Sequence, residues 1–83
     1  MHITIKLYAM LSRYLPPGAE RNVGQLEVPE NASVGSVIEQ LRLPKELVHL
    51  VLVNGVYVRP EQQGTTLLND SDSLAIWPPV AGG

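Results

Sequence analysis

The chain has 83 residues, which is about half the length of a typical domain, and this excludes a multi-domain enzyme. Apolar residues make up 45% and charged residues 17%, a globular composition, and the formal net charge of −2 argues against a basic nucleic-acid-binding module. The absence of cysteine excludes disulfides, thiolate metal sites and a cysteine nucleophile.

The N-terminal segment shows the period-two alternation of a β-strand. Ile3, Ile5 and Leu7 are expected on one face, with Tyr8 and the polar residues between them on the other. Residues 9–15 form a short apolar-rich stretch that predicts a helical turn, which the Pro-Pro-Gly at 16–18 ends. Residues 18–24 are polar and are expected to form a loop.

The next segment predicts a short strand followed by the main helix. Residues 25–28 form the strand, with Leu26 and Val28 inward, and Pro29 ends it because proline donates no backbone hydrogen bond. Ser33 is a favourable N-cap. One apolar stripe follows at helical spacing: Val34, Val37, Ile38, Leu41. Pro44 ends the helix and is expected to begin a further turn over residues 45–48.

The C-terminal half predicts three strands. Residues 49–53 and 56–59 form a hairpin around Asn54-Gly55, because both central residues of a type I′ turn need positive φ. Residues 60–66 are a loop, and both leucines at 67–68 are expected to plug the core. After a turn at 69–72, the strand 73–77 places Leu74 and Ile76 on one face. The order predicts an α+β fold with one helix packed on one face of a mixed sheet.

The C-terminus continues from the last strand into Pro78, Pro79, Val80, Ala81, Gly82 and Gly83. Prolines favour an extended conformation, and an extended tail of six residues reaches roughly 20 Å. A tip without Cβ atoms could enter a narrow tunnel and offer its carboxylate to another protein. The alternative is an ordinary frayed terminus.

This tail resembles that of the MoaD/ThiS family of sulfur carriers, which have the β-grasp (ubiquitin-like) fold, and within the family it is closest to MoaD. Other matching segments are residues 3–9, Leu41, residues 53–55 and residues 68–76, so the resemblance covers nearly the whole chain. It implies a β-grasp domain at 1–77 and a flexible C-terminal arm at 78–83. One departure is Ser71, where the family usually has glycine between two aspartates.

The resemblance implies a sulfur carrier and no enzyme. A ubiquitin-activating-type partner (MoeB/ThiF-like) would adenylate the Gly83 carboxylate with ATP and magnesium, and a sulfur-donor system would convert it to a thiocarboxylate, with Gly82 giving access. The Pro-Pro-Val step favours delivery to the large subunit of molybdopterin synthase. The chain itself would bind no cofactor.

Three alternatives stay open. The same activation would serve a ubiquitin-like modifier joined to lysines through Gly83. The sulfur could instead go to thiamine, cysteine or tRNA. The third alternative is a β-grasp domain that only binds other proteins, for which Gly82 and Gly83 have no role.

Aromatic residues indicate a docking face. The chain has three tyrosines, one tryptophan and no phenylalanine. If the first and last strands are neighbours, Tyr8 and Trp77 share the face away from the helix, and we expect them to form a partner patch with Ala75, Val51 and, less strongly, Tyr57. The alternative is that these aromatics close the core.

Other residues indicate no further site. His2 and His49 lack the partners of a metal site, and Asp70 and Asp72 are typical turn residues. No signal peptide and no apolar run of roughly 20 residues is present. We therefore expect a cytoplasmic protein with no membrane partner.

Overall fold

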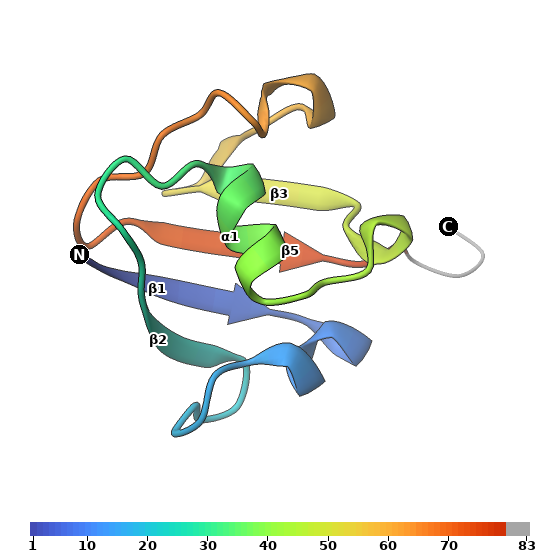
Figure 1. The fold of residues 1–83 in the computed structure, drawn as a ribbon. Helices are drawn as coiled ribbons and strands as arrows, with labels where there is room; N and C mark the ends of the chain where they lie inside the picture. Colours follow the sequence, from blue (N-terminus) through green and yellow to red (C-terminus); the bar gives the residue numbers. More distant parts are fainter. Residues whose placement is uncertain (80–83) are drawn as a thin grey trace.

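The computed structural model describes residues 1–79, which fold around a five-stranded sheet in the order β2-β1-β5-β3-β4 (Figure 1). The strands are β1 His2–Leu7, β2 Val23–Glu27, β3 Leu50–Val53, β4 Val56–Tyr57 and β5 Ser73–Trp77. The central neighbours β1 and β5 run parallel, and the other three pairs are antiparallel. The mixed sheet and the predicted element order are confirmed.

The helix α1, Val34–Gln40, crosses one face of this sheet (Figure 1). Its start is fixed by a reciprocal cap: the Ser33 hydroxyl oxygen accepts from the Ser36 backbone N–H at 3.0 Å, and the Ser33 N–H donates to the Ser36 hydroxyl at 2.9 Å. The predicted cap is therefore confirmed. Leu41 ends the helix as its C-cap.

Three short 3₁₀ segments complete the elements: η1 Ala9–Tyr14, η2 Lys45–Leu47 and η3 Pro60–Gln62. The first two agree with the predicted helical turns. Pro44 lies at the N-cap of η2, one position before the place predicted for it. The third falls in the segment predicted as a loop.

The predicted hairpin is present, with shorter strands. Asn54 and Gly55 have φ of 49° and 82°, as a type I′ turn requires, but β4 ends at Tyr57 and not at residue 59. In contrast, β2 begins two residues earlier than predicted, because Val23 and Gly24 pair with Lys6 and Ile5 of β1. Cross-strand pairing therefore overrides the weak local pattern of residues 18–24.

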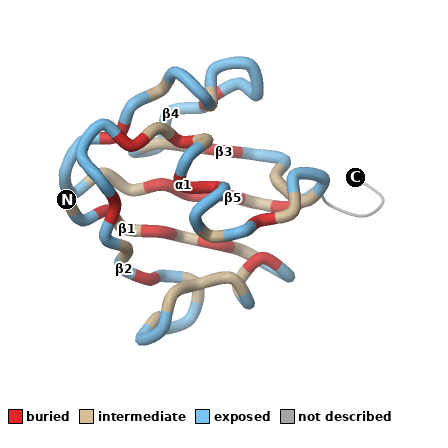
Figure 2. Tube along the Cα trace, in the orientation of Figure 1, coloured by how far each residue is buried: buried red, intermediate tan, exposed pale blue. Residues whose placement is uncertain are grey.

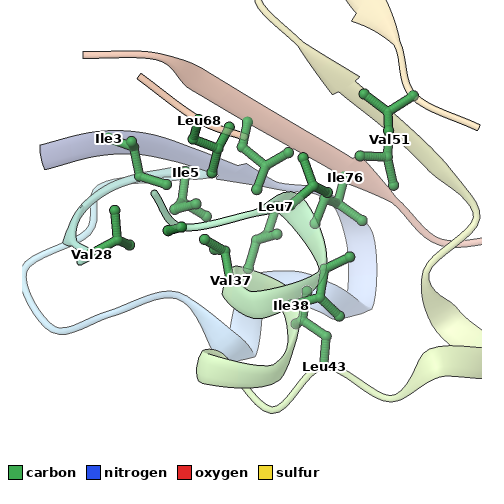
Figure 3. Packing of buried hydrophobic residues seen from close by; sticks show 14 of the residues in the cluster. Ile3, Ile5, Leu7, Val28, Val37, Ile38, Leu43, Val51, Leu68 and Ile76 are labelled. Atoms are coloured by element: carbon green, nitrogen blue, oxygen red, sulfur yellow. The ribbon is translucent and has the colours of Figure 1, made fainter. Parts of the chain in front are cut away.

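The core lies between α1 and the sheet (Figures 2 and 3). Its fully buried members come from β1, η1, α1, β3 and β5: Ile3, Ile5, Leu7, Leu11, Val34, Val37, Val51, Leu74, Ile76. Each large apolar side chain buried in this way contributes about 1.5–3 kcal/mol. The predicted apolar faces of β1, α1 and β5 are thus confirmed.

The prediction for the two leucines at 67–68 is right for one and wrong for the other. Leu68 is 3% exposed and plugs the core, whereas Leu67 is 56% exposed. The Leu68 N–H donates to the Ala32 carbonyl at 2.8 Å, which holds this segment extended against the start of α1. Adjacent residues of an extended segment point in opposite directions, so both could not be buried.

The turn before β5 contains a strained serine. Ser71 has φ of 73°, a left-handed conformation that disfavours residues with a Cβ, and its N–H donates to the His2 carbonyl at 2.7 Å. This is the position where the resembling family usually has glycine. The hydrogen bonds of the turn, including Asn69 N–H to Asp72 at 2.8 Å, hold the strained conformation.

Replacing this serine by glycine is expected to stabilise the domain. Ser71→Gly removes the steric cost of positive φ, and after the greater chain entropy of glycine is subtracted the gain is about 1 kcal/mol. The melting temperature should rise by about 4–8 °C, as measured by circular dichroism. Ser71→Ala, which keeps the Cβ, is the control and should give no gain. A Ser71→Gly variant that melts at or below the wild-type temperature would contradict the assignment of strain.

Candidate functional site

The sheet face opposite α1 carries an apolar surface beside the end of β5. Strand register defines it: Ala75 pairs with Lys6 and Leu52, Trp77 pairs with Leu50, and Tyr57 pairs with Leu52. We call this surface the outer patch, and its residues are Tyr8, Leu50, Leu52, Tyr57, Ala75 and Trp77. Tyr57 is 51% and Leu50 37% exposed, Ala75 is nearly covered, and the other three are half-buried.

Tyr8 and Trp77 form the best-defined contact of the outer patch. Their ring centroids lie 4.3 Å apart and the rings are inclined by 7°, so they are stacked. The parallel register of β1 and β5 explains the contact. Leu7 pairs with Ile76, and both point toward the core, so the next residues, Tyr8 and Trp77, lie side by side on the outer face. The prediction that these two aromatics share the face away from the helix is confirmed.

The predicted place of Val51 on this face is wrong. Val51 pairs with Ile76 and is completely buried on the core side (Figure 3). Its neighbours Leu50 and Leu52 occupy the outer face instead. The sequence analysis missed these two surface residues. Pairing of residues 50–53 with the last strand could have located them, because Leu50 pairs with Trp77 and Leu52 with Ala75.

The other half of the same sheet face is mainly polar, with Val23 as an exposed apolar residue opposite Lys6. His2 Nε2 lies 3.0 Å from Glu27 Oε1, and Gln25 Nε2 donates to the Thr4 hydroxyl at 3.2 Å. These side chains extend over β1 and β2, away from β3 and β4. The outer patch is therefore bounded, and it lies on the side of the sheet formed by β5, β3 and β4.

The C-terminal arm begins at the outer patch. Trp77 ends β5, and its carbonyl accepts from the His49 N–H at 3.0 Å. Pro78 is buried against the domain and Pro79 is exposed. The remaining predicted arm and site residues, Val80, Ala81, Gly82 and Gly83, lie outside the described residues.

The two prolines explain why β5 ends where it does. Proline has no N–H to donate to a neighbouring strand, so the sheet ladder cannot continue beyond Trp77. Pro78 and Pro79 therefore follow directly on the outer patch, at the end of β5 (Figure 1).

Two other kinds of site were sought in residues 1–79. Within this part of the chain, no three His, Asp or Glu residues lie close enough together to hold a metal ion. The helices of the same residues include none long and apolar enough to cross a membrane.

Comparison with known proteins gives a family match and a set of similar folds. The model of the ThiS family matches residues 17–83. No curated protein matches the sequence. The solved structures share the architecture, and the predicted β-grasp, ubiquitin-like fold is confirmed.

Three of the similar structures have sequence identities of 26% or 27% to this chain. The Haloferax volcanii HVO 2177 protein is 27% identical with a TM-score of 0.74, over 100% of this chain and 87% of that one. A Pyrococcus furiosus protein named for molybdopterin converting factor, subunit 1, is 26% identical with a TM-score of 0.69, over 95% and 98%. The H. volcanii small archaeal modifier protein 1 gives the same four values.

Proposed function

The chain belongs to the ThiS family of small ubiquitin-like proteins, and from this premise we propose that it is a sulfur carrier whose Gly83 carboxylate is converted to a thiocarboxylate. The observation that supports the proposal is the position of Trp77, which ends β5 inside the outer patch and is followed directly by Pro78 and the tail. A partner that covers the outer patch would therefore also cover the start of the tail that ends in Gly83.

The chemistry belongs mainly to the partner. A carboxylate is a poor electrophile, so an adenylating enzyme first joins Gly83 to AMP and releases pyrophosphate from ATP, with magnesium in the partner's site. A persulfide sulfur then attacks the acyl carbon and AMP leaves. A thiol reductant cleaves the resulting acyl disulfide to the thiocarboxylate, which serves as the sulfur nucleophile.

The arm's residues suit this role. Gly82 and Gly83 carry no Cβ, which lets a narrow site approach the backbone closely. Pro78 and Pro79 keep the root of the arm extended and offer no N–H to a neighbouring strand. The domain thus supplies docking and reach, and it needs no cofactor of its own.

Two kinds of protein partner follow. The first is an adenylating enzyme of the ubiquitin-activating type (MoeB/ThiF-like). The second is an acceptor enzyme, for which we propose the large subunit of molybdopterin synthase. The Pro-Pro-Val step supports this choice, as does the likeness to a protein named for molybdopterin converting factor, subunit 1. Thiamine, cysteine and tRNA thiolation are the other acceptor pathways.

A second candidate function is a protein modifier joined to lysine side chains through Gly83. The observation that favours it is the 26% identity to the small archaeal modifier protein 1 over nearly the whole length of both chains. Both functions begin with the same adenylate, and they differ in whether sulfur or a lysine amine displaces AMP.

Intact mass separates these functions. The protein is purified from its native host without reducing or alkylating reagents, and we expect a species heavier by one oxygen-to-sulfur exchange, mapped by fragmentation to Gly83. An unmodified mass together with isopeptide conjugates on other proteins would favour the modifier. Absence of both, even after incubation with an adenylating enzyme, ATP and a sulfur donor, would contradict both functions and leave an interaction module.

A further inference from the structure

The stacked pair lies directly at the root of the arm. Trp77 is the last residue of β5, and the residue before a proline has a restricted backbone, so Trp77 and Pro78 together determine the initial direction of the arm. Tyr8 covers one face of the Trp77 ring at a centroid distance of 4.3 Å. Its backbone N–H also donates to the Ile76 carbonyl at 3.2 Å.

The chain bends sharply directly after Tyr8, at Ala9. Ala9 has φ of 52°, a left-handed conformation that is unfavourable for alanine, although its side chain is exposed and forms no part of the core. The bend leads into η1, where the Leu11 N–H donates to the Tyr8 carbonyl at 3.1 Å and the Leu11 side chain is fully buried. Burial of Leu11 thus holds the strained residue that places Tyr8 against Trp77.

We infer that Tyr8 is a positioning residue, which acts through Trp77 to fix the direction in which the arm leaves the domain. The inference rests on the proposed function. A Trp77 held by Tyr8 restricts the direction in which Pro78 and Pro79 carry the chain away from β5, and with it the orientations from which Gly83 has to reach a partner's site. Pre-orientation of a reacting group accelerates a reaction because its entropy is lost before the transition state.

A positioning role differs measurably from a simple contact role. If Tyr8 only touched the partner, removing its ring would weaken docking and raise KM. If Tyr8 orients the arm, docking through the rest of the outer patch survives and kcat falls, because the Gly83 carboxylate reaches the adenylation site in fewer bound complexes. Tyr57 is the matched control, since it lies on the same face but is distant from the arm in strand order.

The experiment measures AMP formation by a MoeB/ThiF-like enzyme as a function of carrier concentration. We expect Tyr8→Ala to lower kcat by about tenfold with little change in KM, because displacing a reacting group by about 1 Å costs up to a hundredfold in rate. Tyr8→Phe, which keeps the stack, should restore the wild-type kcat. Tyr57→Ala should raise KM and leave kcat at the wild-type value.

Fluorescence gives a readout that is independent of activity. Trp77 is the single tryptophan of the chain, so its emission and anisotropy report the stack directly. Tyr8→Ala should lower the anisotropy and Tyr8→Phe should not. Tyr8→Leu retains apolar bulk without a planar ring, and it serves as the test variant if the alanine variant fails to fold by circular dichroism.

The outcomes distinguish the inference from the function on which it rests. A higher KM at unchanged kcat for Tyr8→Ala, or a Tyr8→Phe variant as impaired as Tyr8→Ala, overturns the positioning role while the carrier function stands. A wild-type chain that gives no AMP under these conditions overturns both.

Discussion

A chain that lacks Gly83 is expected to fold normally and to lose adenylation. The adenylate forms on the terminal carboxylate, and deletion moves that carboxylate back by roughly 3.3 Å. Because a displacement of about 1 Å can cost a hundredfold in rate, AMP formation should fall by more than about a hundredfold. The deletion leaves intact the core that is described for residues 1–79, so the thermal unfolding curve should match that of the full-length chain.

The measurement is AMP release with an adenylating enzyme and ATP, accompanied by circular dichroism of both proteins. Gly83→Ala is the matched control: it keeps the length of the arm but adds a Cβ at the tip, and its loss should be smaller than that of the deletion. Ordinary AMP turnover by the shortened chain would refute the role of Gly83 in either proposed function.

A charge at Leu52 is expected to prevent partner docking. Leu52 lies in the middle of the outer patch, paired with Ala75 on one side and Tyr57 on the other. Leu52→Asp would place a carboxylate where a partner must exclude water, and an unpaired buried charge is costly. Hot-spot residues near the centre of an interface contribute about 2 kcal/mol or more, so if Leu52 is one of them Kd for the adenylating enzyme should rise by about thirtyfold or more.

Thr4→Asp is the control for this prediction. Thr4 is on the same sheet face but in the polar half, beside Gln25, so the same added charge should leave Kd nearly unchanged. Titration calorimetry measures both variants, and circular dichroism confirms that they are folded. Equal affinities for the two variants would show that the partner binds elsewhere on the domain.

Local sequence patterns predicted most elements because their causes are local. The alternation in β1, the apolar stripe and serine cap of α1, and the Asn54-Gly55 turn each depend on residues within a few positions of one another. The shared face of Tyr8 and Trp77 followed from the same period of two, once the first and last strands were taken as neighbours. The tail composition is likewise readable without a structure.

The errors arose where local pattern gave no preference. Every residue of Leu50-Val51-Leu52-Val53 is apolar, so alternation alone could not tell which pair faces the core. Similarly, Leu67 and Leu68 are identical in type, and the pairing of this segment with the start of α1, which includes the hydrogen bond from the Leu68 N–H to the Ala32 carbonyl, decides which one is buried.

The sequence by itself determined most strands, the cap of α1 and the Asn54-Gly55 turn, because strand alternation, capping and turn chemistry depend on residue type and short-range spacing. Tertiary structure alone decided that Leu50 and Leu52, and not Val51, complete the outer patch, and that the stacked pair lies beside Pro78. Those features depend on the register of β5 against β1 and β3. Register is set by side chains far apart in the chain that must bury their apolar faces together.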